Sequence, residues 1–200
     1  MLVVEKIGGT SMSKFQDVLQ NIILKSPSYN RIFVVSAYGG ITNLLLEDKK
    51  TRQPGIYRLF EQQETFDRAL GELKHHLFKI NEAFEPIGLD LEKANEYISE
   101  RIDQSHSYLN SMREVIASGY VEKVNILLAA RELLASIGEA HSAYNSVNIM
   151  QSHGLKTKLI DLSGFHDKEY LTINERISKA FKGLDLSDSL AVATGYTKGT

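Results

Sequence analysis

Two short apolar runs, each ending in a glycine pair, constrain the fold of this chain more than any other feature of its sequence. Residues 2–7 lead into Gly8-Gly9, and residues 31–36 lead through Ala37-Tyr38 into Gly39-Gly40. The second run is continuous, which is typical of a strand buried on both faces of a parallel sheet. After each turn apolar residues return at helical spacing, over 15–23 and from 41 onward. The pattern predicts a β-α-β-α unit with both glycine turns at the carboxyl ends of strands.

The middle of the chain is predicted to be helical. From residue 57 to 118 the strand signal is absent, and apolar residues between 56 and 84 keep steps of three and four, which predicts one long helix. Pro86-Ile87-Gly88 breaks this helix, and the same period returns over 97–116. We therefore expect an antiparallel helical hairpin, inserted into an α/β frame at about residues 57–118.

The last third of the chain returns to alternating elements. Gly119 ends the hairpin, and a further long helix is expected over 121–151 and ends at Gly154. A strand over 155–161, a helix over 174–181 and a strand over 189–194 then follow. Strands that alternate with helices predict an α/β fold with a mainly parallel sheet. Pro27 is expected to close the first helix of the chain.

Composition excludes several classes of function. The 200 residues carry 23 basic and 25 acidic side chains, so no cationic field is present to bind nucleic acid. The chain contains no cysteine, which excludes disulfides, thiolate zinc sites and a cysteine nucleophile. Glu5 and Lys6 interrupt the first apolar run, and no stretch reaches the ~18 apolar residues of a membrane span. We expect a soluble, cytoplasmic protein with no membrane partner.

The first glycine turn has the form of a phosphate site. In Lys6-Ile7-Gly8-Gly9-Thr10-Ser11, glycines allow backbone N–H groups to approach an anion, and the lysine at the strand end adds a full positive charge. The spacing matches neither the P-loop nor the dinucleotide motif. An ordinary turn at a strand end is the alternative.

The second turn repeats this arrangement with two hydroxyl groups, those of Ser36 and Thr42, around Gly39-Gly40. In an open α/β sheet, ligands bind outside the carboxyl ends of the strands, where both turns are expected. The alternative is that Ser36 only ends a strand and Thr42 caps a helix.

Glu139 is a third candidate, because its helical neighbours are apolar and a buried carboxylate needs a partner. An ammonium group on a ligand could be that partner. The ordinary alternative is that Glu139 is an acidic side chain on the surface of a helix. The six histidines show no metal-binding spacing, and we assign them no role and no metal site. Asp161, at a strand end, could face the ligand site expected at the carboxyl edge of the sheet. Alternatively, its side chain could only stabilise its own turn.

Four blocks, taken together, resemble the aspartokinases of the amino acid kinase family. They are Val4-Glu5-Lys6-Ile7-Gly8-Gly9-Thr10-Ser11, Val34-Val35-Ser36-Ala37-Tyr38-Gly39-Gly40-Ile41-Thr42-Asn43-Leu44-Leu45, Ser136-Ile137-Gly138-Glu139 and Thr194-Gly195-Tyr196. The resemblance implies a three-layer αβα sandwich. Residues 1–200 would be its N-terminal, amino-acid-binding lobe, while a C-terminal lobe with most of the nucleotide site, and regulatory ACT domains, would lie outside this sequence.

The resemblance also implies roles for single residues. Lys6 would be catalytic and would bridge the transferring phosphate, and Ser36, Thr42, Glu139 and Tyr196 would bind the substrate, with Glu139 on its α-ammonium group. The phosphate-binding residues would be Lys6, Gly8, Gly9, Thr10, Ser11, Gly39 and Gly40. The chain departs from the family pattern at Ile7, at Tyr38 and at Tyr196, which stands where the family usually has phenylalanine.

The activity implied is transfer of the γ-phosphoryl group of ATP, with Mg²⁺, to the β-carboxylate of L-aspartate, by a homodimer. The residues of the first two blocks are similar to those of the ectoine-associated branch of aspartokinases. This similarity puts feedback control by lysine or threonine in question. These 200 residues would be incomplete for catalysis. Two alternatives remain: another amino acid kinase, acting on acetylglutamate, glutamate or carbamate, and a non-catalytic aspartate-binding or interaction module.

Overall fold

A computed structural model describes residues 1–25 and 29–198, and its centre is a parallel sheet. The strands are β1 (Val3–Ile7), β2 (Arg31–Val35), β3 (Thr157–Ile160) and β4 (Leu190–Thr194), in the order β1-β2-β4-β3. Ile7 lies opposite Val35, and Val35 opposite Thr194, so three strands end side by side. The parallel α/β sheet is confirmed, and it brings both glycine turns to one edge. Pro27 lies outside the described residues.

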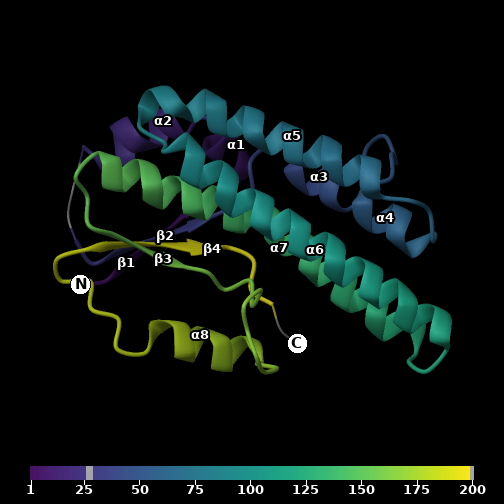
Figure 1. Cartoon of the computed structure of the whole chain (residues 1–200). Coiled ribbons are helices and arrows are strands. Elements are labelled where there is room, and N and C mark those ends of the chain that lie inside the picture. The colour runs from purple at the N-terminus through teal and green to yellow at the C-terminus, as the bar shows by residue number, and fades with distance from the viewer. Residues whose placement is uncertain (26–28, 199–200) are drawn as a thin grey trace.

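Helices cover both faces of this sheet, as Figure 1 shows. They are α1 (Gly9–Met12), α2 (Phe15–Val18), the π-helix η1 (Leu19–Ile23), α3 (Ile41–Leu45), α4 (Ile56–Glu61), α5 (Asp67–Phe84), the 3-10 helix η2 (Glu85–Ile87), α6 (Leu91–Ser118), α7 (Lys123–Ser152) and α8 (Ile173–Phe181). Phe33, Val35 and Val192 point into the core beneath α7, whereas Ile32 and Ala191 belong to a smaller cluster with α8. This alternation produces the three layers that were expected.

The helical hairpin is confirmed, but the prediction of one long helix over 56–84 is wrong. The chain turns after α4 because Gln63 adopts a left-handed conformation with φ of 61°. Its N–H donates to the carbonyl of Phe60, and the N–H of Glu64 donates to the carbonyl of Leu59. This is a Schellman turn, which usually has glycine at the position of Gln63. Nothing in the sequence signals a helix end there.

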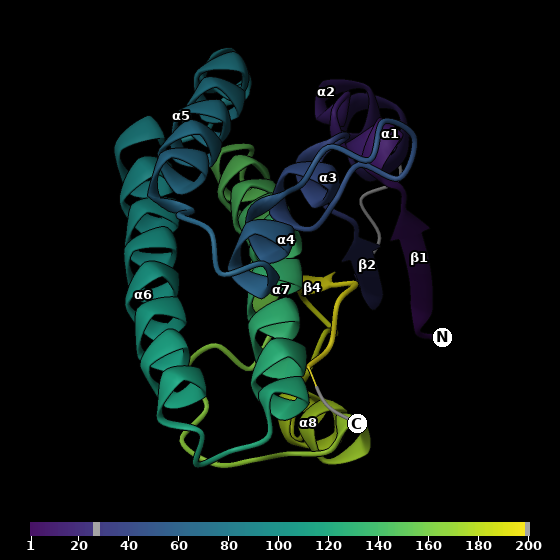
Figure 2. The same cartoon turned by 90° about the vertical axis from the view of Figure 1, so that its right-hand side faces the viewer.

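The two halves of the hairpin, α5 and α6, run antiparallel on either side of η2. Gly88, with φ of 100°, reverses the chain between them, and Lys74 on α5 pairs with Asp103 on α6 at 3.1 Å. Gly119 ends α6 in the left-handed conformation, and α7 then returns along α6. Figure 2 shows the three long helices side by side. No helix within the described ranges is long and apolar enough to cross a bilayer.

A buried polar cluster joins this hairpin to α7. Asn81 Oδ1 accepts a hydrogen bond from Asn145 Nδ2 at 2.8 Å and lies 2.7 Å from His141 Nε2, while Asn81 Nδ2 donates to Asn95 Oδ1 at 2.8 Å. Burial lowers the pKa of His141 to about 3, so its imidazole is neutral at ordinary pH. Tyr38 packs edge-on against this imidazole, with ring centroids 5.4 Å apart. The cluster thus reaches the second glycine turn.

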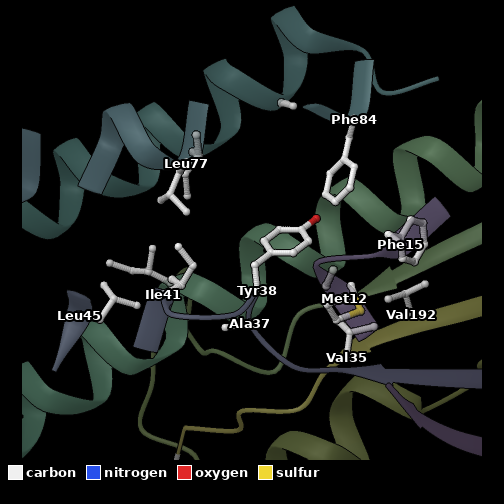
Figure 3. Packing of buried hydrophobic residues seen from close by; sticks show 14 of the residues in the cluster. Met12, Phe15, Val35, Ala37, Tyr38, Ile41, Leu45, Leu77, Phe84 and Val192 are labelled. Carbon is white, nitrogen blue, oxygen red and sulfur yellow. The ribbon is translucent and has the colours of Figure 1, made fainter. Parts of the chain in front are cut away.

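The close contact between α7 and the segment after β2 depends on Gly138. A Cβ atom at this position would lie 2.7 Å from the Cβ of Ala37 and 2.9 Å from Cγ2 of Ile41, distances that real side chains do not adopt. Figure 3 shows Ala37 and Ile41 close to Tyr38, whose ring points toward Phe84. The missing side chain at 138 therefore allows the segment that carries Ser36 and Thr42 to approach the helix that carries Glu139.

We predict that Gly138→Ala destabilises the protein by about 1–3 kcal/mol, because an added methyl group overpacks this contact. Gly71→Ala on α5 is the matched control, since nothing lies within 4 Å of the added atom. That change should stabilise the protein by about 0.5–1 kcal/mol through helix propensity. Urea unfolding of the two variants measures both effects. Equal shifts in the two would contradict the role of Gly138.

Candidate functional site

The two glycine turns meet at the carboxyl edge of the sheet, as the sequence predicts. The Gly39 N–H donates to Ser13 Oγ at 2.9 Å, and Ser13 Oγ in turn donates to the Gly9 carbonyl at 3.2 Å. A Cβ atom on Gly9 would lie 2.7 Å from the Ala37 carbonyl oxygen, so only glycine allows this approach. Sequence reasoning missed Ser13, although it lies only two residues after the first motif.

The first turn offers backbone donors and a lysine rather than a helix dipole. Lys6 is exposed and lies one residue before the end of β1. Gly8 precedes α1, a single turn of four residues that holds Thr10 and Ser11 in exposed positions. The helix expected after this turn is divided into α1, α2 and the π-helix η1. Because so short a helix carries little dipole, an anion here would depend on N–H groups and on Lys6.

Glu139 lies half-buried on α7, where it faces both turns. Burial raises the pKa of its carboxyl group, while the N–H groups of Tyr196 and Ala37 and the charge of Lys6 act in the opposite direction. The net pKa is above the ordinary value. One carboxyl oxygen, Oε2, is buried and has no hydrogen-bond partner among the residues that the structure describes. A buried acceptor without a donor is costly, and a cationic ligand would supply the missing donor.

The segment after β4 completes the surroundings of Glu139. A Cβ atom on Gly195 would lie 3.2 Å from Glu139 Oε2 and 2.9 Å from the Val35 carbonyl oxygen. The Gly195 N–H donates to that same carbonyl at 2.9 Å. Thr194 Oγ1 donates to the Tyr196 carbonyl at 2.9 Å and accepts from the Leu162 N–H at 3.0 Å. Three predicted blocks thus converge on one carboxylate.

Ser36 and Thr42 take different positions around this point. The Ser36 carbonyl accepts a hydrogen bond from Ser142 Oγ of α7 at 2.9 Å, which holds the residue beside Glu139. Thr42 is exposed on α3 and does not cap it, because the N-cap is Gly40 with φ of 85°. Thr42 instead lines a cavity beside Arg131.

Tyr196 is half-buried between charged groups. Burial raises the pKa of its hydroxyl, Glu132 and Glu139 raise it further, and Arg131 and Arg176 oppose the rise. The phenol therefore stays protonated at ordinary pH. Arg131 and Glu132 had no signal in the sequence, because neither belongs to a recognised motif.

The Asp161 carboxylate accepts a hydrogen bond within its own turn and forms an ion pair with the helical hairpin. Its Oδ1 accepts from the Ser163 N–H at 2.8 Å, and its Oδ2 lies 2.6 Å from Arg101, whose side chain is only 2% exposed. Burial raises the pKa of Asp161, but Arg101 and Ser163 outweigh it and hold the pKa below its usual value. Within the described part of the chain, no three His, Cys, Asp or Glu side chains are grouped to hold a metal ion.

Comparison with known families identifies this architecture. The family model described as the amino acid kinase family matches residues 1–199. The chain belongs to the amino acid kinase family. The resemblance seen in the four blocks is thereby confirmed at the level of the family.

Among members of this family with curated names, the chain is 43% identical over 204 residues to aspartate kinase Ask_Ect of Stutzerimonas stutzeri (strain A1501). The match covers 98% of this chain and 43% of that protein. This chain therefore spans less than half the length of the relative that it matches.

Two solved structures of Escherichia coli aspartokinase III share the fold. One, in complex with aspartate and ADP in the R-state, matches with a TM-score of 0.63 at 20% identity, over 97% of this chain and 40% of that one. The other, with lysine and aspartate in the T-state, has a TM-score of 0.56 at 21% identity, over 96% and 40% of the two chains. At these identities the matches establish the fold, and the αβα architecture expected of an amino acid kinase is confirmed.

The raised pKa of Glu139 predicts that its charge destabilises the free protein. Between the ordinary pKa and the higher native pKa, the native state holds a proton that the unfolded chain has released, so stability falls as pH rises through this window. Glu139→Gln should therefore be more stable than the wild type at pH 7, and the difference should shrink as pH falls toward 4.5, the ordinary value.

Urea midpoints measured from pH 4 to pH 8 test this expectation. Glu114→Gln, which removes an exposed acid on α6, controls for the general effect of losing one negative charge. A stability difference between Glu139→Gln and wild type that does not depend on pH would contradict the prediction.

Proposed function

We propose that this chain is the amino-acid-binding lobe of an aspartate kinase, which transfers the γ-phosphoryl group of ATP to the β-carboxylate of L-aspartate. The observation that carries the proposal is the half-buried Glu139 carboxylate, held beside Lys6 where both glycine turns and the Gly195-Tyr196 segment meet. The 43% identity to a protein named aspartate kinase supports the choice of aspartate over other amino acids. The nucleotide lobe and any ACT domains would lie outside these 200 residues.

In this proposal Glu139 binds the α-ammonium group of aspartate. Its unpaired Oε2 accepts the hydrogen bond that the protein itself does not supply. Ser36, whose carbonyl is held by Ser142, and the exposed Thr42 would offer their hydroxyl groups to the substrate. Tyr196, which is half-buried and near enough to Glu139 to feel its charge, would pack against the substrate. A carboxylate is already ionised at ordinary pH, so the reaction needs no general base.

The two reactants are both anions, and the lobe must therefore reduce their repulsion. An oxygen of the β-carboxylate forms a bond to the γ-phosphorus, and the bond from phosphorus to the bridging oxygen breaks, leaving that electron pair on ADP. Lys6 and the N–H groups at Gly8, Gly9 and Gly40 would take up charge on the transferring phosphoryl group. The Gly39 N–H is already bonded to Ser13 Oγ, so Gly39 would shape the turn rather than donate. Thr10 and Ser11 add exposed hydroxyls near the first turn.

The proposal also covers a metal ion, a metabolic branch and an assembly. Mg²⁺ would supply further charge compensation, but the described residues contain no cluster to hold it, and the roles above do not depend on it. The relative's name, Ask_Ect, favours an ectoine branch of aspartate metabolism. A cytoplasmic homodimer agrees with such a role, and the exposed apolar side chains of Val124 and Leu128 on α7 support a subunit contact.

The proposal predicts that the 200-residue chain binds L-aspartate and that Glu139→Gln weakens this binding at least about tenfold, because one charged hydrogen bond is lost. Calorimetric titration measures the affinity, with Glu114→Gln as the matched control that should bind as the wild type does. Mg-ATP is titrated separately. Preference for glutamate or acetylglutamate over aspartate would favour another amino acid kinase, and unchanged aspartate binding in Glu139→Gln would contradict the assigned site.

A further inference from the structure

Two buried arginines hold the segment of residues 161–167, which follows β3 at the carboxyl edge of the sheet. Arg101 of α6 is 2% exposed and Arg176 of α8 is 4% exposed. Figure 1 shows α6 and α8 on opposite sides of the sheet, so the segment is held from both outer layers. A buried guanidinium is costly unless it is paired and hydrogen-bonded, and the partners of the two arginines therefore matter.

Arg101 fixes the first part of this segment. Its Nη1 donates to Ser163 Oγ at 3.0 Å, and its Nη2 lies 2.6 Å from Asp161 Oδ2. Its guanidinium carbon also lies 4.4 Å from the centre of the Phe165 ring, in a cation–π contact. All three of these partners belong to residues 161–165.

Arg176 reaches beyond the segment. Its Nη1 pairs with Asp167, and its Nε donates to the Lys198 carbonyl at 2.8 Å. A Cβ atom on Gly164 would lie 2.6 Å from Arg176 Nη1, so the guanidinium packs directly on the backbone there. One buried side chain thus joins the segment after β3 to the segment after β4.

Hydrogen bonds fix the segment after β4 at both of its ends. The Leu162 N–H donates to Thr194 Oγ1 at 3.0 Å, and the Lys198 N–H donates to the Leu162 carbonyl at 3.1 Å. Residues 195–197 form a short loop between these two anchors. The Lys198 anchor is the one whose carbonyl Arg176 holds.

This 195–197 loop contacts the Glu139 carboxylate. A Cβ atom on Gly195 would lie 3.2 Å from Glu139 Oε2. The Tyr196 N–H is one of the two backbone donors to the carboxyl group, and Lys6 is the charged group that acts on it. Hydrogen bonds weaken steeply with distance and angle, so a displacement of the loop by roughly 1 Å would remove this donor.

Stability alone does not account for Arg176. Replacing a buried ion pair by apolar side chains of similar volume is often neutral or stabilising, so a buried arginine is poor evidence of a purely structural role. The specific feature of Arg176 is its geometry, because its Nε and Nη1 groups bind two segments that are separate in the chain.

We propose that Arg176 is a positioning residue, which acts through the Lys198 carbonyl to hold the 195–197 loop against Glu139 and so keeps this carboxylate oriented for an ammonium group. The identity of the ligand rests on the proposed function. The contact between Arg176 and the loop does not rest on it, and the two can therefore be tested separately.

The first test needs no ligand and compares Glu139→Gln with the native Glu139, in the wild-type and in the Arg176→Met background, by urea midpoints from pH 4 to pH 9. Loss of the Tyr196 N–H raises the pKa of Glu139 further, because this donor favours the ionised form. The stability gained through Glu139→Gln should then keep growing to about one pH unit higher than in the wild-type background. An unchanged pH range would overturn the inference.

Two further variants separate positioning from other effects of Arg176. Asp167→Asn is the matched control, because it removes the ion pair and leaves the bond to the Lys198 carbonyl. It should lower the urea midpoint without moving the pH range. Arg176→Lys keeps the charge but lacks the Nε donor, and it should move the range as Arg176→Met does. A shift in Asp167→Asn equal to that in Arg176→Met, or a range restored by lysine, would contradict the positioning role.

Calorimetric titration with L-aspartate links the loop to binding. Arg176→Met should weaken aspartate about tenfold, while Asp167→Asn should bind as the wild type does. Unchanged aspartate binding in Arg176→Met overturns the inference, and if Glu139→Gln still loses binding, the proposed function stands. Circular dichroism checks the fold of each variant, and Arg176→Lys carries the same comparisons where Arg176→Met does not fold.

The opposite result is also distinguishable. If the pH range moves in Arg176→Met but the wild-type chain binds no aspartate, Arg176 positions Glu139 as inferred and the proposed function fails.

Discussion

The site depends on one contact, between α7 and the segment that follows β2. Gly138 lets the backbone of Ala37 approach the helix, and Ser142 Oγ holds the Ser36 carbonyl at 2.9 Å. His141 packs against the ring of Tyr38. Because positions 138, 141 and 142 are three and four residues apart, they share one face of the helix. The same helix carries Glu139, so the second glycine turn and the carboxylate are positioned by a single surface.

The helical hairpin takes part in this arrangement and is not a separate appendage. Asn81 on α5 and Asn95 on α6 hydrogen-bond in the same buried cluster as His141 and Asn145 on α7. Hydrogen bonds are directional, and an unpaired buried polar group is costly, so a register shift between these helices would break several interactions at once. The ring of Tyr38 lies between this cluster and Phe84, at 5.4 Å from each neighbouring ring, and links the hairpin to the second turn.

Features that depend on local sterics could be predicted from the sequence, whereas features that depend on distant partners could not. Gly8-Gly9 and Gly39-Gly40 marked the strand ends correctly because glycine is the residue that such turns require. The end of α4 was missed because Gln63 adopts a left-handed backbone conformation that glutamine rarely adopts. Arg101 and Asp161 lie 60 residues apart in the chain, and no short motif could have indicated their ion pair. The cations that line the cavity beside Thr42 could not be predicted either, because the loop of 46–55 and Arg131 are far apart in the chain.

The electrostatics of Glu139 link ligand binding to stability. In the free protein this carboxylate faces backbone N–H groups and Lys6, and burial still raises its pKa, so its ionised form is held in an unfavourable environment. A more favourable environment would require a protein cation beside Oε2, and that cation would compete with an ammonium group for the same oxygen. Leaving the oxygen unpaired keeps it available to a ligand at the expense of some stability. A bound ammonium group then stabilises the native state in proportion to its concentration relative to its dissociation constant, since the unfolded chain offers no such site.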